Sequence, residues 1–101
     1  MTKRIRTRRP TTPGEVLREE FLTPLGLTQR QLAEHIGCDI KVINRIVNGS
    51  RVTVSMAFSL ASSLDTTPEF WLNLQREVDV FNFRQEGYDL PGVLPALQKA
   101  S

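Results

Sequence analysis

The sequence is poor in the residues from which disulfides, metal sites and nucleophilic active sites are built. Of 101 residues, one is cysteine and one is histidine, so no disulfide can form within the chain and no Cys or His pair has metal-ligand spacing. Glu19 and Glu20 are neighbours that diverge by about 100° on a helix and cannot form a carboxylate pair. No nucleophile–base pair or phosphate-binding glycine loop is present. We therefore expect no enzyme, no metal, no cofactor and no small-molecule substrate.

Long apolar runs are also missing. No run of about 18 apolar residues could span a bilayer, and the basic N-terminus lacks the apolar stretch of a secretory signal. We expect a cytoplasmic protein that does not bind membranes.

Charge is distributed unevenly along the chain. The hydrophobic fraction of 40% and the charged fraction of 24% predict one small domain with a single core. The net charge is only +2, yet residues 1–9 carry five basic and no acidic side chains, whereas residues 53–101 carry three basic and six acidic ones. A cationic first half and an acidic second half suit two different partners.

Residues 28–49 have the pattern of two short amphipathic helices joined by a tight turn at Gly37. Thr28 can cap the first helix, with Gln31 completing a capping box, and Asp39 can cap the second. Apolar residues recur at helical spacing, Leu32, Ala33 and Ile36 in the first helix and Ile43, Ile46 and Val47 in the second. An Asn-Gly pair then ends the second helix. The pattern predicts a helix-turn-helix.

The polar edge of the second helix indicates what this motif does. Lys41, Asn44, Arg45 and Asn48 lie at i, i+3, i+4 and i+7, which is one continuous helix edge. Their amide and cationic groups suit base edges and phosphates. The alternative is a helical hairpin with a solvated polar face, but such a face usually mixes both signs of charge. The edge therefore favours a DNA-reading helix.

Three further helices are predicted around this motif. Their start signals are Thr12-Pro13 with Glu15 for a helix ending near Leu22, Thr53 for a core helix, and Thr67-Pro68-Glu69 for a helix ending at Asn82 or Phe83. In the first of them, Leu17 and Phe21 should face inward.

The last of these helices is apolar over more than half of its circumference, so it must be buried on two sides. In a chain this small, burial of the second side is expected to come from another subunit. A self-complementary two-fold patch closes into a dimer. The predicted dimer interface consists of Phe70, Trp71, Leu74, Val78 and Phe81.

The two ends of the chain should lie outside the helical bundle. We divide the chain into a flexible basic arm (1–11), a helix-turn-helix DNA-binding and dimerisation domain (12–83) and a C-terminal extension (84–101). The arm is either a solubilising tail or a segment that follows DNA phosphates or enters a minor groove. The extension has a short helix predicted near Val93 to Lys99.

Three segments resemble a known family: PGEVLREEFLTPLGLTQRQLA from Pro13 to Ala33, the Asn-Gly stop at Asn48-Gly49, and TPEFWLNLQ from Thr67 to Gln75. They resemble the HigA-type (VapI-like) antitoxins of the phage-repressor-like (XRE) helix-turn-helix group, over about residues 12–80. The resemblance implies an all-α, five-helix phage-repressor-like bundle, here with a basic N-terminal arm and a short C-terminal extension. It also implies a homodimeric repressor of its own operon that binds double-stranded operator DNA.

The resemblance further implies DNA contacts at Gln29, Ile40, Lys41, Asn44 and Arg45, followed by a backbone contact at Arg51. Ile40 departs from the family pattern, in which many relatives have a polar residue. It either packs on a thymine methyl group or folds inward with Ile43 and Val47, and we favour the DNA contact slightly.

The family's protein partner is a RelE/HigB-like mRNA endonuclease toxin that the antitoxin holds inactive. The acidic second half of the chain would attract a basic RNase. Two surfaces are candidates, the helix edge of Glu15, Glu19 and Glu20 and the apolar segment from Tyr88 to Leu97, and we favour the latter. A stand-alone repressor without a toxin and a helix-turn-helix used only for protein interaction are the alternative functions.

Overall fold

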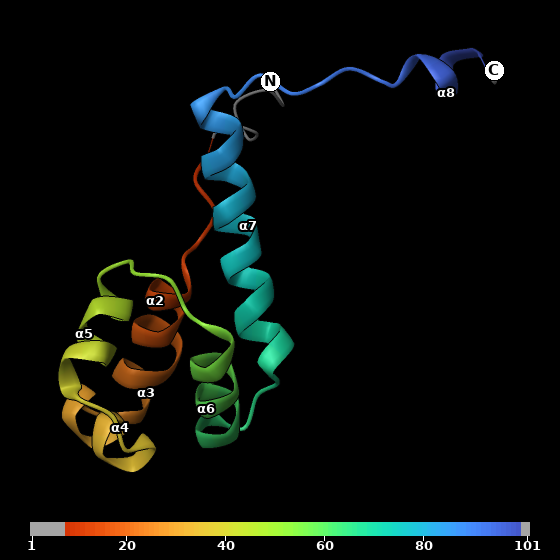
Figure 1. Cartoon of the computed structure of the whole chain (residues 1–101). Coiled ribbons are helices and arrows are strands. Elements are labelled where there is room, and N and C mark those ends of the chain that lie inside the picture. The colour runs from red at the N-terminus through yellow and green to blue at the C-terminus, as the bar shows by residue number, and fades with distance from the viewer. Residues whose placement is uncertain (1–7, 100–101) are drawn as a thin grey trace.

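The computed structural model describes residues 8–99, and Figure 1 shows a small helical bundle from which one long helix projects. The elements are α2 (Pro13–Val16), η1 (Leu17–Leu22), α3 (Thr23–Leu25), α4 (Gln29–Ile36), α5 (Ile40–Val47), α6 (Val54–Leu64), α7 (Pro68–Glu86) and α8 (Pro95–Lys99). The first three follow one another without a break and form one continuous helix. With α4 to α7 they make up the five predicted helices, so the all-α helix-turn-helix bundle is confirmed.

Threonine side chains begin four of these five helices. The hydroxyl groups of Thr12, Thr28, Thr53 and Thr67 each accept a hydrogen bond from the N–H three residues on, at 3.0–3.2 Å. In turn, the Glu15 side chain accepts a hydrogen bond from the Thr12 N–H and the Gln31 side chain accepts one from the Thr28 N–H, both at 2.9 Å. A cap of this kind stabilises a helix by about 1 kcal/mol. The predicted start signals are therefore confirmed.

The first helix is longer than predicted. It does not end near Leu22 but continues to Leu25, with π-helical turns between Leu17 and Leu22. Pro24 has no N–H to donate, and its ring would clash with the carbonyl four residues back in a regular α-helix. The wider π turns that precede this proline accommodate it. Gly26, with a φ of 62°, ends the helix.

The π turns also change which side chains face the core. Hydrogen bonds from i to i+5 place Leu22 one turn after Leu17, so both are buried, with 6% and 0% of their surface exposed. Phe21, which we predicted to face inward beside Leu17, is half-buried and packs against the edge of the core.

Each of these five helices contributes at least one large side chain to the core, and the largest of them is Trp71. Leu17, Leu32, Ile43, Leu60 and Trp71 are all buried. The indole Nε1 of Trp71 donates to the Thr66 hydroxyl at 2.8 Å, and its ring lies 5.6 Å from that of Phe21. This single core holds α2 to α6 against the first turns of α7.

The predicted dimer interface requires a correction at Trp71. Its side chain is 0% exposed within one chain, so it belongs to the core and offers no surface to a second subunit. Leu74 also packs in part against the core, whereas Val78 and Phe81 are half-buried outside the core cluster. Phe70 stands edge-on to Trp71 and is exposed in part.

The longest helix, α7, extends well beyond the bundle. It was predicted to end at Asn82 or Phe83, but Arg84, Gln85 and Glu86 are good helix formers and it stops only at Gly87, where φ is 66°. Figure 1 shows its second half leaving the bundle and the chain then running on to α8. No described helix is both long enough and apolar enough to cross a membrane.

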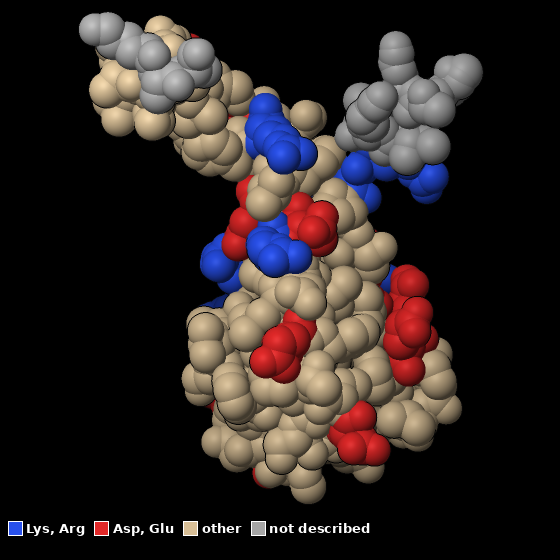
Figure 2. Space-filling view, turned by 90° about the vertical axis from the view of Figure 1, so that its right-hand side faces the viewer, with Lys and Arg blue, Asp and Glu red and all other residues tan. Residues whose placement is uncertain are grey.

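Charged side chains gather on only part of the face formed by α6 and α7. Figure 2 shows acidic and basic groups around the middle of this face, and below them only scattered acidic groups on an otherwise uncharged surface. The sequence of α6 contains no charged residue, and its side chains Val54 and Phe58 are exposed.

Gly14 allows the first helix to cross α5 at very short range. A Cβ atom at this position would lie 1.9 Å from the carbonyl oxygen of Ile46 and 3.0 Å from the carbonyl carbon of Val47. Both atoms belong to the backbone of α5, so no rotamer change could relieve the clash. Glycine is therefore required where the first helix supports the predicted reading helix.

We predict that Gly14→Ala lowers the free energy of unfolding by about 3 kcal/mol, because the added methyl group must push two helix backbones apart. Gly92→Ala is the matched control, since a Cβ there meets nothing within 4 Å, and it should change stability by less than about 0.5 kcal/mol. Urea unfolding of the two variants measures both values. Equal free energies of unfolding for the two variants would contradict a close backbone crossing at Gly14.

Candidate nucleic-acid interface

The turn between α4 and α5 has the geometry that the sequence predicts. Gly37 has a φ of 88°, a left-handed conformation that favours glycine. The N–H groups of Gly37 and Cys38 both donate to the carbonyl of Ala33, at 2.8 and 3.0 Å. The carboxylate of Asp39 accepts from the Lys41 N–H at 2.9 Å. These contacts close α4 and begin α5 within three residues.

Two opposite faces of α5 are clearly distinguished by burial. Ile43, Ile46 and Val47 are buried in the core, whereas the predicted polar edge of Lys41, Asn44, Arg45 and Asn48 is exposed. The described ion pairs are Arg18–Glu19, Arg51–Asp79 and Arg76–Glu77. Lys41 and Arg45 thus have no carboxylate partner in the described part of the chain, and their charge is available to an anion.

Three amide side chains are joined by hydrogen bonds across the helix pair. The Asn48 side-chain nitrogen donates to the Asn44 carbonyl oxygen at 2.9 Å and to its Oδ1 at 3.2 Å. The Asn44 side-chain nitrogen donates in turn to Oε1 of Gln29, at the start of α4, at 3.1 Å. Sequence reasoning placed Asn44 and Gln29 at the site separately and missed this bond, because nothing in the helical spacing shows how α4 and α5 cross.

Ile40 takes a position between the two predicted alternatives. It is half-buried and packs in part against the core, with the rest of its surface exposed at the start of α5. Its contact with DNA stays a prediction.

Arg51 follows α5 in the loop that leads to α6. Its exposed guanidinium donates from Nη1 to the carboxylate of Asp79 on α7. Arg51 and Arg45 both line a small hollow of about 150 Å³ beside the end of α5. The structure therefore places the predicted backbone contact next to the reading helix, and it reveals an acidic partner that the sequence did not indicate.

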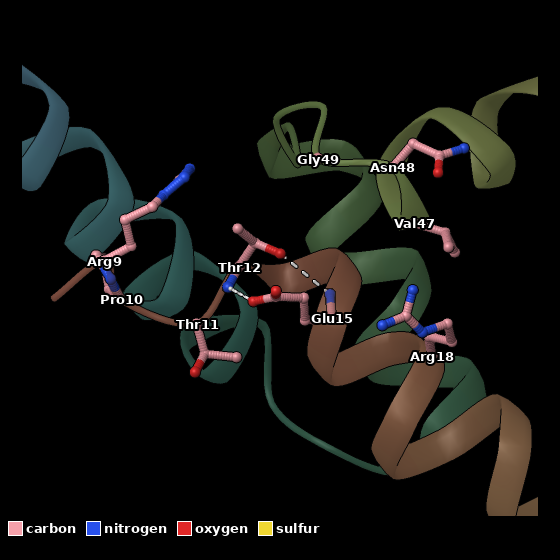
Figure 3. A pocket seen from close by; sticks show the side chains of 9 residues that line it. All are labelled: Arg9, Pro10, Thr11, Thr12, Glu15, Arg18, Val47, Asn48 and Gly49. Atoms are coloured by element: carbon pink, nitrogen blue, oxygen red, sulfur yellow. Dashed lines mark hydrogen bonds between the residues drawn. The ribbon is translucent and has the colours of Figure 1, made fainter.

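A larger hollow lies under the C-terminal end of α5 and is drawn in Figure 3. Its volume is about 490 Å³, and its lining includes Arg9, Arg18, Asn48 and Gly49. Figure 3 shows the two arginines on either side of the Thr12–Glu15 capping pair. Residues 8–11 of the predicted basic arm (1–11) are described, and Arg8 and Arg9 are both exposed. Residues 1–7 of that arm lie outside the described residues.

Comparisons with known proteins agree with this geometry. Residues 17–71 match a family described as "Helix-turn-helix". Antitoxin HigA-1 of Vibrio cholerae serotype O1 is 44% identical over 77 residues, which cover 76% of this chain and 73% of the relative. The solved structure of antitoxin GraA has a TM-score of 0.75 and 42% identity, covering 78% of this chain and 86% of that one. Pseudomonas aeruginosa antitoxin HigA, solved with the higBA promoter, has a TM-score of 0.74 and 32% identity, covering 85% and 100%.

We predict that Arg45→Ala weakens binding to a specific duplex by about 1–3 kcal/mol and relaxes base preference at one position, if Arg45 reads a guanine. Arg76→Ala, which removes the same charge from an exposed site on α7, should leave base preference unchanged. Fluorescence titrations against a panel of single-base variants measure both effects. An Arg45→Ala protein with unaltered affinity and preference would exclude Arg45 as a reader.

Proposed function

Since the chain belongs to the helix-turn-helix family and, within it, to the HigA-type antitoxins, we propose that it represses its own operon and neutralises a toxin. In this proposal it acts in the cytoplasm as a homodimer on double-stranded operator DNA, and its protein partner is a RelE/HigB-like mRNA endonuclease. The observation that carries the DNA-binding part is the exposed edge of α5, whose Lys41 and Arg45 have no carboxylate partner among the described residues.

The proposed DNA complex inserts α5 into the major groove. Arg45 and Asn44 would read base edges, because guanidinium and amide groups match the donor and acceptor pattern of purines. The bond between Asn44 and Gln29 would hold both amides in place before DNA arrives. Lys41 and Arg51 would contact phosphates, which fix the register of the protein on the duplex. The Pseudomonas aeruginosa relative was solved with the higBA promoter, which supports the proposal that this chain binds DNA.

The proposed dimer forms through the second half of α7. Val78 and Phe81, one turn apart on α7, are half-buried without joining the core cluster. Val80 and Phe83 are exposed toward the other side of the helix. An apolar face that lies outside the core is most simply explained by a second copy of the same helix, because a two-fold contact closes on itself. Two reading helices would then meet half-sites about one helical turn apart.

The proposed toxin contact uses the C-terminal extension. Leu90 and Leu94 are 71% and 66% exposed, and Val93 and Leu97 are exposed to a similar degree. Figure 1 shows this segment far from α5, so a toxin bound there would leave the reading helix accessible. The competing surface is the exposed acidic edge of the first helix, with Glu15, Glu19 and Glu20.

We predict that Phe81→Glu yields a folded monomer whose operator binding is much weaker, because a charge in the α7 contact blocks association while the core is untouched. Arg76→Glu also introduces a negative charge, at an exposed position on the opposite side of the helix, and should stay dimeric. Analytical ultracentrifugation gives the mass, and circular dichroism checks the fold. If both variants remain dimers, the interface lies elsewhere on the molecule.

The toxin part of the proposal is tested by co-expression with a neighbouring gene, provided that this gene encodes a small basic protein that inhibits growth. The full chain should rescue growth. A chain truncated after Asp89 retains all of α7, its Gly87 stop and the Tyr88 ring stacked on Phe83, and it should bind operator DNA but fail to rescue.

Two further results would decide against parts of this proposal. Rescue by the truncated chain, together with loss of rescue on changing Glu19 and Glu20 to lysine, would move the toxin contact to the first helix. No rescue by the full chain, with operator binding intact, would favour a stand-alone repressor.

A further inference from the structure

The loop between α5 and α6 is fastened to α7 by a connected set of polar contacts. The Val52 N–H donates to Oε1 of Gln75 at 2.9 Å, and Nε2 of the same amide donates to Oδ1 of Asp79 at 3.1 Å. That same carboxylate oxygen accepts from the Arg51 guanidinium. Gln75 is 6% exposed and Val52 is buried. The two α7 side chains lie one turn apart, so one face of α7 fixes both the backbone and the charge of this loop.

The loop is also tied to the reading helix. The Ser50 N–H donates to the Arg45 carbonyl at 2.9 Å, and the Gly49 N–H donates to the Ile46 carbonyl at 3.0 Å. These contacts hold the backbone at Arg51 in place, so only the Arg51 side chain can change its direction. The Arg51 side chain is 66% exposed and that of Asp79 40% exposed.

The Arg51–Asp79 pair carries no net charge, whereas the other basic side chains near α5 keep theirs. Lys41 and Arg45 meet no carboxylate in the described part of the chain, whereas Arg51 is neutralised by Asp79 before any DNA is bound. A neutralised arginine gains less from a phosphate, because the carboxylate beside it repels the same phosphate. The guanidinium carries five N–H donors, so it can hold Asp79 through Nη1 and still offer donors to an oxyanion.

We propose that Asp79 is a positioning residue that restrains the affinity of this protein for DNA by holding Arg51 as a neutral pair at the edge of the reading helix. The inference rests on the proposed DNA binding. Arg51 would contact the phosphate with its charge largely compensated, and the strength of that contact would be set from α7 and not from the helix-turn-helix itself.

The test compares Asp79→Asn with Glu77→Gln in the full-length chain. Asparagine keeps an Oδ1 acceptor for Gln75 and Arg51 but removes the charge. Glu77→Gln removes the same charge two residues away on α7, from a side chain that is exposed and paired only with Arg76 in the described part of the chain. The probe is a labelled duplex taken from the DNA immediately upstream of the chain's own coding sequence, titrated over a range of salt concentrations.

We expect Asp79→Asn to bind this duplex about two- to fivefold more tightly than Glu77→Gln, which is the range that an exposed ion pair is worth. The slope of log K against log salt should steepen by up to about 0.9, the value of one added phosphate contact. In an Arg51→Ala background, Asp79→Asn should lose this advantage. A merely structural role would alter urea unfolding and leave the salt slope unchanged.

Three results would overturn the inference. If the wild-type chain binds the duplex and Asp79→Asn behaves like Glu77→Gln, Asp79 has no effect on Arg51. If Asp79→Asn binds more weakly, the carboxylate assists the contact and does not restrain it. If the wild-type chain binds neither this duplex nor any other DNA, both this inference and the proposed DNA binding are wrong.

Discussion

The close crossing of the first helix over α5 is the contact on which the rest of this structure depends. At Gly14 the two backbones approach so closely that a Cβ would meet a carbonyl oxygen at 1.9 Å. The contact fixes the depth at which α5 sits in the bundle, and thereby decides that Ile43, Ile46 and Val47 are buried while Lys41 and Arg45 face outward. A helix that reads bases, as proposed for α5, must be rigid, and close packing of the two backbones keeps α5 rigid.

The long helix α7 combines two roles that are separated along its length. Its first turns carry Trp71 into the core and Gln75 against the loop after α5. Its second half leaves the bundle with Val78 and Phe81 outside the core cluster. A partner that packs on the second half would therefore act on the same helix that holds Arg51. This arrangement gives protein association a direct physical route to the loop that is proposed to contact DNA.

Most of the local structure could be predicted from the sequence, because local signals determine it. The caps at Thr12, Thr28 and Thr67 and the stop at Gly37 depend on residues within three or four positions. Features set by three-dimensional packing were missed or misjudged. No helical spacing shows that Trp71 turns into the core, that η1 buries Leu22, or that the amides of Asn44 and Gln29 meet.

The candidate site also combines features that the sequence predicts with features that only three-dimensional packing creates. The exposed edge of α5 follows from periodicity alone, since a buried stripe implies an opposite face. The pairing of Arg51 with Asp79 joins residues 28 positions apart, and only the way α7 passes the loop brings them together. Acidic residues on α7 were expected to attract a toxin, and one of them instead faces a predicted DNA contact.

The self-contained helix starts have a consequence for how the chain folds. Each threonine cap, two of them followed by proline, can begin a helix before distant parts of the chain have met, and such local order is typical of fast-folding helical proteins. The crossing of Gly14 over Ile46 is different, because it closes a long stretch of chain and demands that both helices already exist. If it forms after the main barrier, Gly14→Ala will speed unfolding and leave the refolding rate in stopped-flow experiments nearly unchanged.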